Sequence, residues 1–169
     1  MTSCQRCNKC CTNHLILVTP QDAARVEKET GISAVLFLDV IDDRKERERG
    51  EPAFILNGKE KLLVLQKQMN NSCILFNGKG CSVHAARPFL CRVYPFSANE
   101  KGELVSLPSR ACKEKWFPEG EEAKQYLQDA RAYQQQLEDY KKAIEKWNQI
   151  TLKQKRSLAD FIEFMKKEF

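Results

Sequence analysis

The sequence predicts an α+β fold in two parts: a small cysteine-rich domain of short helices and β-hairpins, and then a C-terminal antiparallel helical hairpin. All eight cysteines of the 169 residues lie before residue 113. In that first part, Asn-Gly and other glycine turns separate short apolar runs, a pattern typical of hairpins. The cysteine-free remainder is rich in Glu, Lys and Gln and has apolar residues at helical spacing. We therefore expect a cysteine-cluster domain over residues 1–116 and a helical extension over 117–169.

The first elements are predicted to be two short helices. Thr19 is a suitable N-cap, Pro20 fits the first helical position, and Gly31 is the expected stop. Ser33 then caps a second short helix that we expect over 33–40. The charged run 42–51 is expected to be a solvated turn or a loose helix end.

Three segments between residues 53 and 107 are predicted to be strands and turns. Residues 53–57 and 61–66 flank Asn57-Gly58, which is a strong hairpin signal. Residues 73–76 are expected to form a strand that ends in the glycine-rich turn 77–80. Residues 93–96 and 103–107 are expected to pair around the turn 99–102.

The last part is predicted to be two helices. An a/d heptad stripe runs along the segment 121–147, through Ala123, Tyr126, Ala130, Tyr133, Leu137, Tyr140, Ile144 and Trp147. Thr151 to Gln154 has the pattern of a capping box that begins a second helix with an apolar face. The stripe either packs on the first part as core or forms a surface for self-association or a protein partner.

Composition and charge exclude some classes of function. The net charge of +5 is spread along the chain without a basic block, so a nucleic-acid surface is not favoured. No apolar run approaches the roughly 18 residues that a membrane span needs. The first residues have no apolar stretch typical of a secretory leader. We therefore expect a cytoplasmic protein, in which clustered cysteines bind metal more often than they form disulfides.

The cysteines form two blocks. The first is Cys4-x-x-Cys7-x-x-Cys10-Cys11, in which the two-residue gaps let thiolates converge from one tight loop. Cys10 and Cys11 are adjacent and would point to different partners, which indicates two nearby sites or one site with an additional thiol beside it. The second block runs from Cys73 through Cys81 to Cys91. Neither block completes a zinc finger, so any four-ligand site must combine the two.

We accordingly predict metal ligands among all eight cysteines. Cys4, Cys7, Cys10 and Cys91 are the first candidates, and the others are Cys11, Cys73, Cys81 and Cys112. The excess of cysteine over histidine favours an iron–sulfur cluster, with [4Fe–4S] as the expected type, over zinc. His84, three residues after Cys81, is an optional ligand. Arg87 and Arg92 would offset the charge of nearby thiolates.

These residues also resemble a known family. The ordered set is the first block, then Cys73-Ile-Leu-Phe, then Gly80-Cys81-Ser-Val-His84, then Arg87-Pro-Phe-Leu-Cys91-Arg-Val-Tyr-Pro-Phe. It resembles the YkgJ-type cysteine-cluster family, the zinc- or iron-chelating domains named for their CxxCxxCC motif, over about residues 1–112. Family members often have Tyr at the position of His84, which weakens the case for that histidine. The resemblance implies metal or iron–sulfur binding, and it implies no reaction.

Three functions are compatible with this pattern. The first is a cytosolic metal-cluster protein for redox chemistry, sensing or cluster handling. The second is a structural zinc-binding module whose helices present a partner surface. The third is an enzyme with an open metal or an activated thiolate such as Cys11, for which the sequence has no recognisable acid–base partners.

Overall fold

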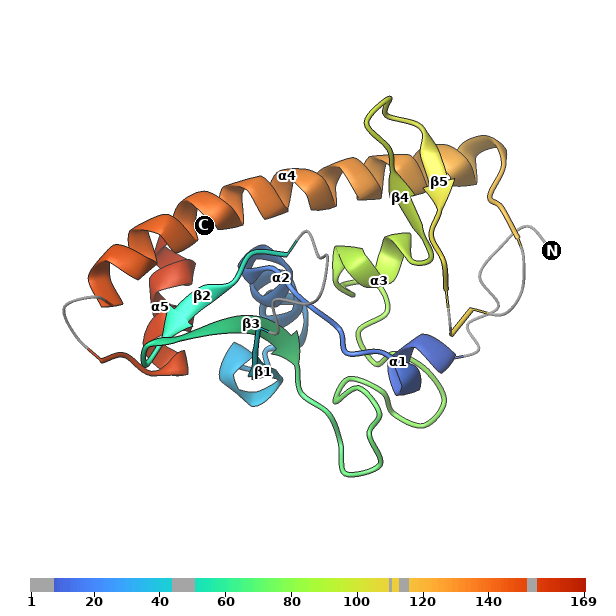
Figure 1. Cartoon of the computed structure of the whole chain (residues 1–169). Coiled ribbons are helices and arrows are strands. Elements are labelled where there is room, and N and C mark those ends of the chain that lie inside the picture. The colour runs from blue at the N-terminus through green and yellow to red at the C-terminus, as the bar shows by residue number, and fades with distance from the viewer. Residues whose placement is uncertain (1–7, 44–50, 110, 113–115, 152–154) are drawn as a thin grey trace.

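The computed structural model describes residues 8–43, 51–109, 111–112, 116–151 and 155–169. Its helices and small antiparallel sheets confirm the predicted α+β class (Figure 1). The elements in chain order are α1 (Lys9–Asn13), α2 (Pro20–Thr30), the 3-10 helix η1 (Ala34–Leu36), β1 (Leu38–Asp42), β2 (Phe54–Leu56), β3 (Lys59–Leu65), α3 (Phe89–Val93), β4 (Phe96–Ala98), β5 (Leu104–Ser106), α4 (Gly120–Thr151) and α5 (Leu158–Glu168).

The larger sheet has the antiparallel order β1-β3-β2. The predicted hairpin at Asn57-Gly58 is confirmed, with β2 and β3 joined by these two residues at φ 52° and 76°. Two positive φ angles are the signature of the tight turn that matches strand twist. The buried residues Leu62 to Leu65 make β3 the centre of the fold.

Helix α2 has the predicted ends, whereas the helix predicted over 33–40 is wrong. Thr19 Oγ1 accepts a hydrogen bond from the backbone N–H of Asp22, and Gly31 ends the helix at φ 69°. After Ser33 the helix lasts only one 3-10 turn, and residues 38–42 form β1 against β3. Pairing with a buried strand outweighs the weak local helix preference of these β-branched and apolar residues.

Two strand predictions need correction. Residues 73–76 form no strand; only isolated bridges join Lys67 to Cys73 and Phe76 to Cys81. The 93–107 hairpin exists as β4–β5, but Val93 ends helix α3 and the strand begins at Phe96. The charged run 42–51 lies largely outside the described residues.

Two helices follow, as predicted, but the second begins later than expected. Thr151 is the last residue of α4. Helix α5 begins after Ser157, whose Oγ accepts from the N–H of Asp160 while the Asp160 carboxylate accepts from the N–H of Ser157. This reciprocal pair is a true capping box. Of the capping box predicted at 151–154, the last three residues lie outside the described chain.

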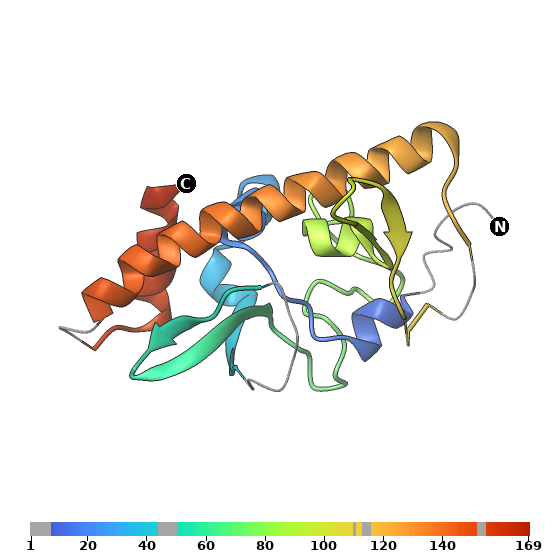
Figure 2. The same ribbon diagram turned by 45° about the horizontal axis from the view of Figure 1, so that its top comes forward.

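Helix α4 lies along the whole molecule and covers both sheets (Figures 1 and 2). Its heptad stripe faces this chain: Tyr140, Ile144 and Trp147 join the main buried cluster. The Phe54 and Phe161 rings stack with centroids 3.7 Å apart, and Trp147 Nε1 donates to Ile55 O at 2.8 Å. The core alternative is thus what the packing favours, and a partner surface on 121–147 stays a prediction.

Candidate metal centre

Helix α1, the 66–88 segment and α3 lie near one another at one end of the molecule (Figures 1 and 2), and together they carry five cysteines. Cys10 and Cys11 lie on α1, Cys73 and Cys81 lie on the irregular segment after β3, and Cys91 lies on α3. These five are free thiols. Cys4 and Cys7, which precede α1 by a few residues, lie outside the described residues.

Helix α1 is fixed to the second block by backbone and side-chain hydrogen bonds. Asn8 starts it in the left-handed region at φ 60°, a conformation that Asn tolerates, and its Nδ2 donates to Lys79 O at 3.2 Å. At the other end, the N–H of Cys73 donates to Cys11 O at 2.8 Å. The two cysteine blocks are therefore joined directly, as a shared site requires.

The segment from Cys73 to Ser82 is a tight double turn. The N–H of Phe76 donates to Cys73 O, and the N–H of Ser82 donates to Leu75 O, both at 2.9 Å. Asn77 Oδ1 accepts from the N–H groups of both Lys79 and Gly80. The chain thus folds back on itself between Cys73 and Cys81 without forming a regular strand.

Helix α3 is held by charged side chains of α2. The buried Asp22 accepts from the N–H of Phe89 at 3.1 Å and from Arg25 at 2.5 Å. Arg25 also donates to the carbonyls of Ala86 and Arg87. A helix of five residues is not stable alone, so these contacts fix the backbone that carries Cys91.

The five thiols lie close enough to shift each other's pKa. Burial is the main cause of the raised pKa of Cys91, and the neighbouring Cys73 and Cys10 raise this pKa further. Burial also raises the pKa of Cys73 and of Cys81, and Cys10 again contributes to both. Raised pKa values keep these buried thiols protonated when no metal is bound, so a metal would bind them by displacing their protons.

Two cations reduce this repulsion. The Arg87 guanidinium adds to the lowering of the pKa of Cys10 and opposes the rise in the pKa of Cys81, and the Lys67 ammonium opposes the rise in the pKa of Cys73. These directions agree with the expected role of Arg87, which stays a prediction. Arg92 instead donates to backbone carbonyls of residues 85 and 87 and lies over the Phe89 ring.

A hydrogen bond between their side chains shifts the pKa values of Cys10 and Cys11 in opposite directions. A hydrogen bond from the Cys11 thiol lowers the pKa of Cys10 to about 6. The same bond, together with burial and the other thiols, raises the pKa of Cys11. A raised pKa is the opposite of what an activated nucleophile needs, so it argues against Cys11 as a catalytic thiolate.

A series of hydrogen bonds links the backbone of Cys112 to His14, just after α1. The Cys112 backbone N–H is bonded to Ser109 Oγ at 2.8 Å, Ser109 Oγ pairs with the Tyr94 hydroxyl, and that hydroxyl is 2.8 Å from His14 Nε2. His14 directly follows α1. The sequence did not predict roles for Tyr94 or Ser109, since their partners are distant in the chain.

His84 faces an arginine. Arg87 Nη1 donates to His84 O at 2.7 Å and lies 3.1 Å from His84 Nδ1. A guanidinium beside Nδ1 competes with a metal for that nitrogen, so this contact does not favour His84 as a ligand.

The described residues do not by themselves form a finished metal site. Among residues 8–43, 51–109, 111–112, 116–151 and 155–169, no three Cys, His, Asp or Glu side chains are spaced to hold one ion. The donor set is nevertheless sulfur-rich and partly buried, which suits iron–sulfur clusters and zinc. The first two cysteines of the CxxCxxCC segment would have to complete any site.

A family profile matches residues 3–115, which is two thirds of the chain, and its description is "CxxCxxCC: Putative zinc- or iron-chelating domain". The chain belongs to this family. The matched CxxCxxCC region includes all eight cysteines and ends just before α4. Neither the curated proteins nor the solved structures gave a significant match.

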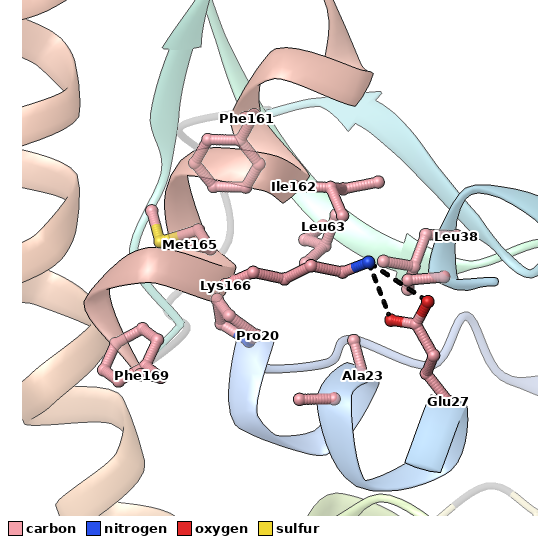
Figure 3. A pocket seen from close by; sticks show the side chains of 12 residues that line it. Pro20, Ala23, Glu27, Leu38, Leu63, Phe161, Ile162, Met165, Lys166 and Phe169 are labelled. Carbon is pink, nitrogen blue, oxygen red and sulfur yellow. Dashed lines mark hydrogen bonds and ion pairs between the residues drawn. The ribbon is translucent and has the colours of Figure 1, made fainter. Parts of the chain in front are cut away.

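A cavity of about 250 Å³ lies between α2 and α5, away from helix α1, which carries Cys10 and Cys11. Phe161, Ile162 and Met165 face Pro20 and Ala23 across it (Figure 3). Its two charged lining residues, Glu27 and Lys166, are paired with each other at 3.0 Å. The cavity thus contains no charged group that awaits a ligand.

In the part of the chain that the structure describes, no helix has the length and apolar character to cross a bilayer.

Proposed function

We propose that this CxxCxxCC-family chain binds an iron–sulfur cluster, of the [4Fe–4S] type, through cysteines of both blocks. The observation that carries the proposal is the direct link between the two cysteine blocks, in which the N–H of Cys73 donates to Cys11 O at 2.8 Å. The pKa contributions among Cys10, Cys73, Cys81 and Cys91 support it. A sulfur-only donor set is the one that such clusters use. A bound cluster would supply one-electron chemistry or be passed on to another protein.

The ligands would be divided between the two blocks. Cys10 interacts electrostatically with Cys73, Cys81 and Cys91, so it is the central member of the described group. Cys4 and Cys7 are proposed to complete the set from the N-terminal side, and Cys11 and Cys112 are proposed as further ligands or as thiols beside the site. Ligands from both blocks would make metal binding part of the folding energy.

Two cations near the cysteines would partly offset the negative charge of a cluster bound by thiolates. Lys67 and Arg87 are the cations that lower thiol pKa values here. Hydrogen bonds and charges around the sulfurs tune cluster potentials. We therefore propose a redox, sensing or cluster-handling role in the cytoplasm, where thiols stay reduced.

Anaerobic purification followed by iron, sulfide and zinc assays tests the proposal. A brown protein with iron and sulfide in equal amounts and visible absorption supports it. A colourless protein with stoichiometric zinc and no sulfide overturns the cluster and leaves metal chelation.

Structural zinc is the second candidate, because the cysteine segments have little regular structure of their own. Residues 73–81 have no strand and α1 has only five residues. Closed cysteine sites are what such segments commonly fold around. Under this alternative, removal of zinc by an added chelator would unfold the 8–14 and 73–91 regions, and the protein would show no redox signal.

A further inference from the structure

Two side chains that lie two and three residues after the end of β3 contact the two cysteine blocks. The Lys67 ammonium donates to Cys11 O at 3.2 Å and to His14 O at 2.5 Å. These carbonyls are at the end of α1, where a helix leaves its last acceptors without internal partners. Lys67 thus caps the helix that carries Cys10 and Cys11.

Gln68 contacts the other block. Its Nε2 donates to Phe76 O at 2.6 Å and Cys73 O at 3.1 Å, and it lies 3.4 Å from Ile74 O. Its backbone N–H donates to Ser72 O at 2.8 Å. The side-chain amide of Gln68 is therefore within hydrogen-bonding distance of three backbone carbonyls of the turn that contains Cys73.

Lys67 and Gln68 can contact different cysteine blocks because they are neighbours in an extended segment. Consecutive side chains of such a segment point to opposite sides. Lys67 forms a bridge pair with Cys73, and its ammonium reaches α1, while Gln68 reaches the turn. Both follow β3, whose residues Leu62 to Leu65 are buried, so their base is rigid.

We propose that Lys67 and Gln68 are positioning residues of the metal site, which form a polar latch between β3 and the two cysteine blocks. This inference rests on the proposed function and extends it to residues outside the cysteine motif. Lys67 acts through the carbonyls of α1 and as a cation beside the thiolates. Gln68 acts through the backbone of 73–76.

The latch predicts an effect on metal binding that exceeds its effect on folding. Removal of groups that orient metal ligands typically weakens metal binding by roughly 10- to 100-fold. Lys67→Met keeps the apolar stem and removes both donors and the charge. Lys67→Arg keeps the charge and donors and is the conservative variant. Lys59→Met, which changes an exposed lysine at the start of β3, is the matched control.

Co²⁺ affinity of the full chain, measured by chelator competition and followed by thiolate charge-transfer absorption, is the first readout. Amide hydrogen exchange of the metal-free chain is the second. The N–H of Cys73, bonded to Cys11 O, should exchange faster in Lys67→Met, and that of Leu65, bonded to Ile16 O, should not. Lys67→Arg and Lys59→Met should resemble the wild type in both.

Equal Co²⁺ affinity and equal Cys73 exchange in Lys67→Met and wild type would overturn the latch while leaving the proposed function intact. Failure of the wild type to bind Co²⁺ at all would instead overturn the proposed function. If Lys67→Met does not fold, Gln68→Met decides. It should weaken Co²⁺ binding by a comparable factor, and wild-type affinity in that variant would refute the inference.

Discussion

The Cys10–Cys11 pair is the smallest unit of the site whose behaviour can be measured. Because the Cys11 thiol donates to the Cys10 sulfur, the pKa of Cys10 is lowered to about 6 and that of Cys11 is raised. In the metal-free chain, alkylation of Cys10 should therefore follow a titration with its midpoint near pH 6. The ionised form is present above that pH and is lost as the pH falls through it.

Cys11→Ala should move this midpoint upward toward that of an ordinary thiol, because it removes the donor. Ser106→Ala, at an exposed position of β5, is the control. Alkylation at controlled pH with mass-spectrometric assignment gives the midpoints. An unchanged midpoint in Cys11→Ala would contradict the hydrogen bond from Cys11 as the cause of the lowered pKa of Cys10.

At the scale of single elements, the capping box of α5 gives a defined stability. Ser157→Ala removes the acceptor for the Asp160 N–H and should lower the free energy of unfolding by roughly 0.5–2 kcal/mol. For a chain of this size, each 1 kcal/mol lowers the melting temperature by about 2–4 °C. Ser106→Ala, on an exposed strand position, is the control.

The same box predicts a pH dependence. Bonds from the Ser157 N–H and hydroxyl lower the pKa of Asp160 below its ordinary value. Its stabilising effect is thus present above the ordinary Asp pKa and is lost as the pH falls through the lowered one. Thermal melts at neutral and acidic pH should show the Ser157→Ala deficit shrinking in acid. A deficit that grows in acid would be inconsistent with this cap.

Local signals in the sequence predicted some elements well and others poorly. Thr19, Pro20 and Gly31 define α2 by themselves, and Asn57-Gly58 defines its hairpin, because both depend on backbone preferences of a few residues. Residues 38–42 became a strand only through pairing with β3. Lys67 and Gln68 could not be predicted, since each contacts residues that only the fold brings near.

At the scale of the whole molecule, the two parts of the sequence share one core. The main buried cluster takes Val26, Leu63 and Cys73 from the first part, and Trp147 and Phe161 from the second. Deletion of residues 117–169 should therefore prevent folding although all eight cysteines remain. Circular dichroism and metal content check this. A soluble, folded fragment that binds metal normally would refute it.

A single core residue gives a milder test of the same point. Phe161 is fully buried, stacks on Phe54 and contacts the Trp147 ring. Phe161→Ala should cost about 3–5 kcal/mol of unfolding free energy, the usual value for a large buried ring. Denaturant titration measures it, with Phe117→Ala, a partly exposed ring, as the control. Equal losses in both variants would contradict the shared core.

For the site, the sequence predicted which residues to consider, and their role as ligands stays a prediction. The cysteine spacing indicated that residues 4–11 and 73–91 must combine, and Cys10, Cys73 and Cys81 contribute to the raised pKa of Cys91. The partition of ligands depends on how α1, the 73–82 turn and α3 are held by Lys67, Gln68 and Asp22. Those contacts have no local signature.

The central claim is that cysteines of both blocks bind one metal centre. X-ray absorption at the iron and zinc edges of the anaerobically purified chain tests it most directly. The account predicts a first coordination shell made of sulfur, with metal–sulfur distances of about 2.3 Å. A shell dominated by nitrogen and oxygen, or a chain without bound iron or zinc, would contradict it.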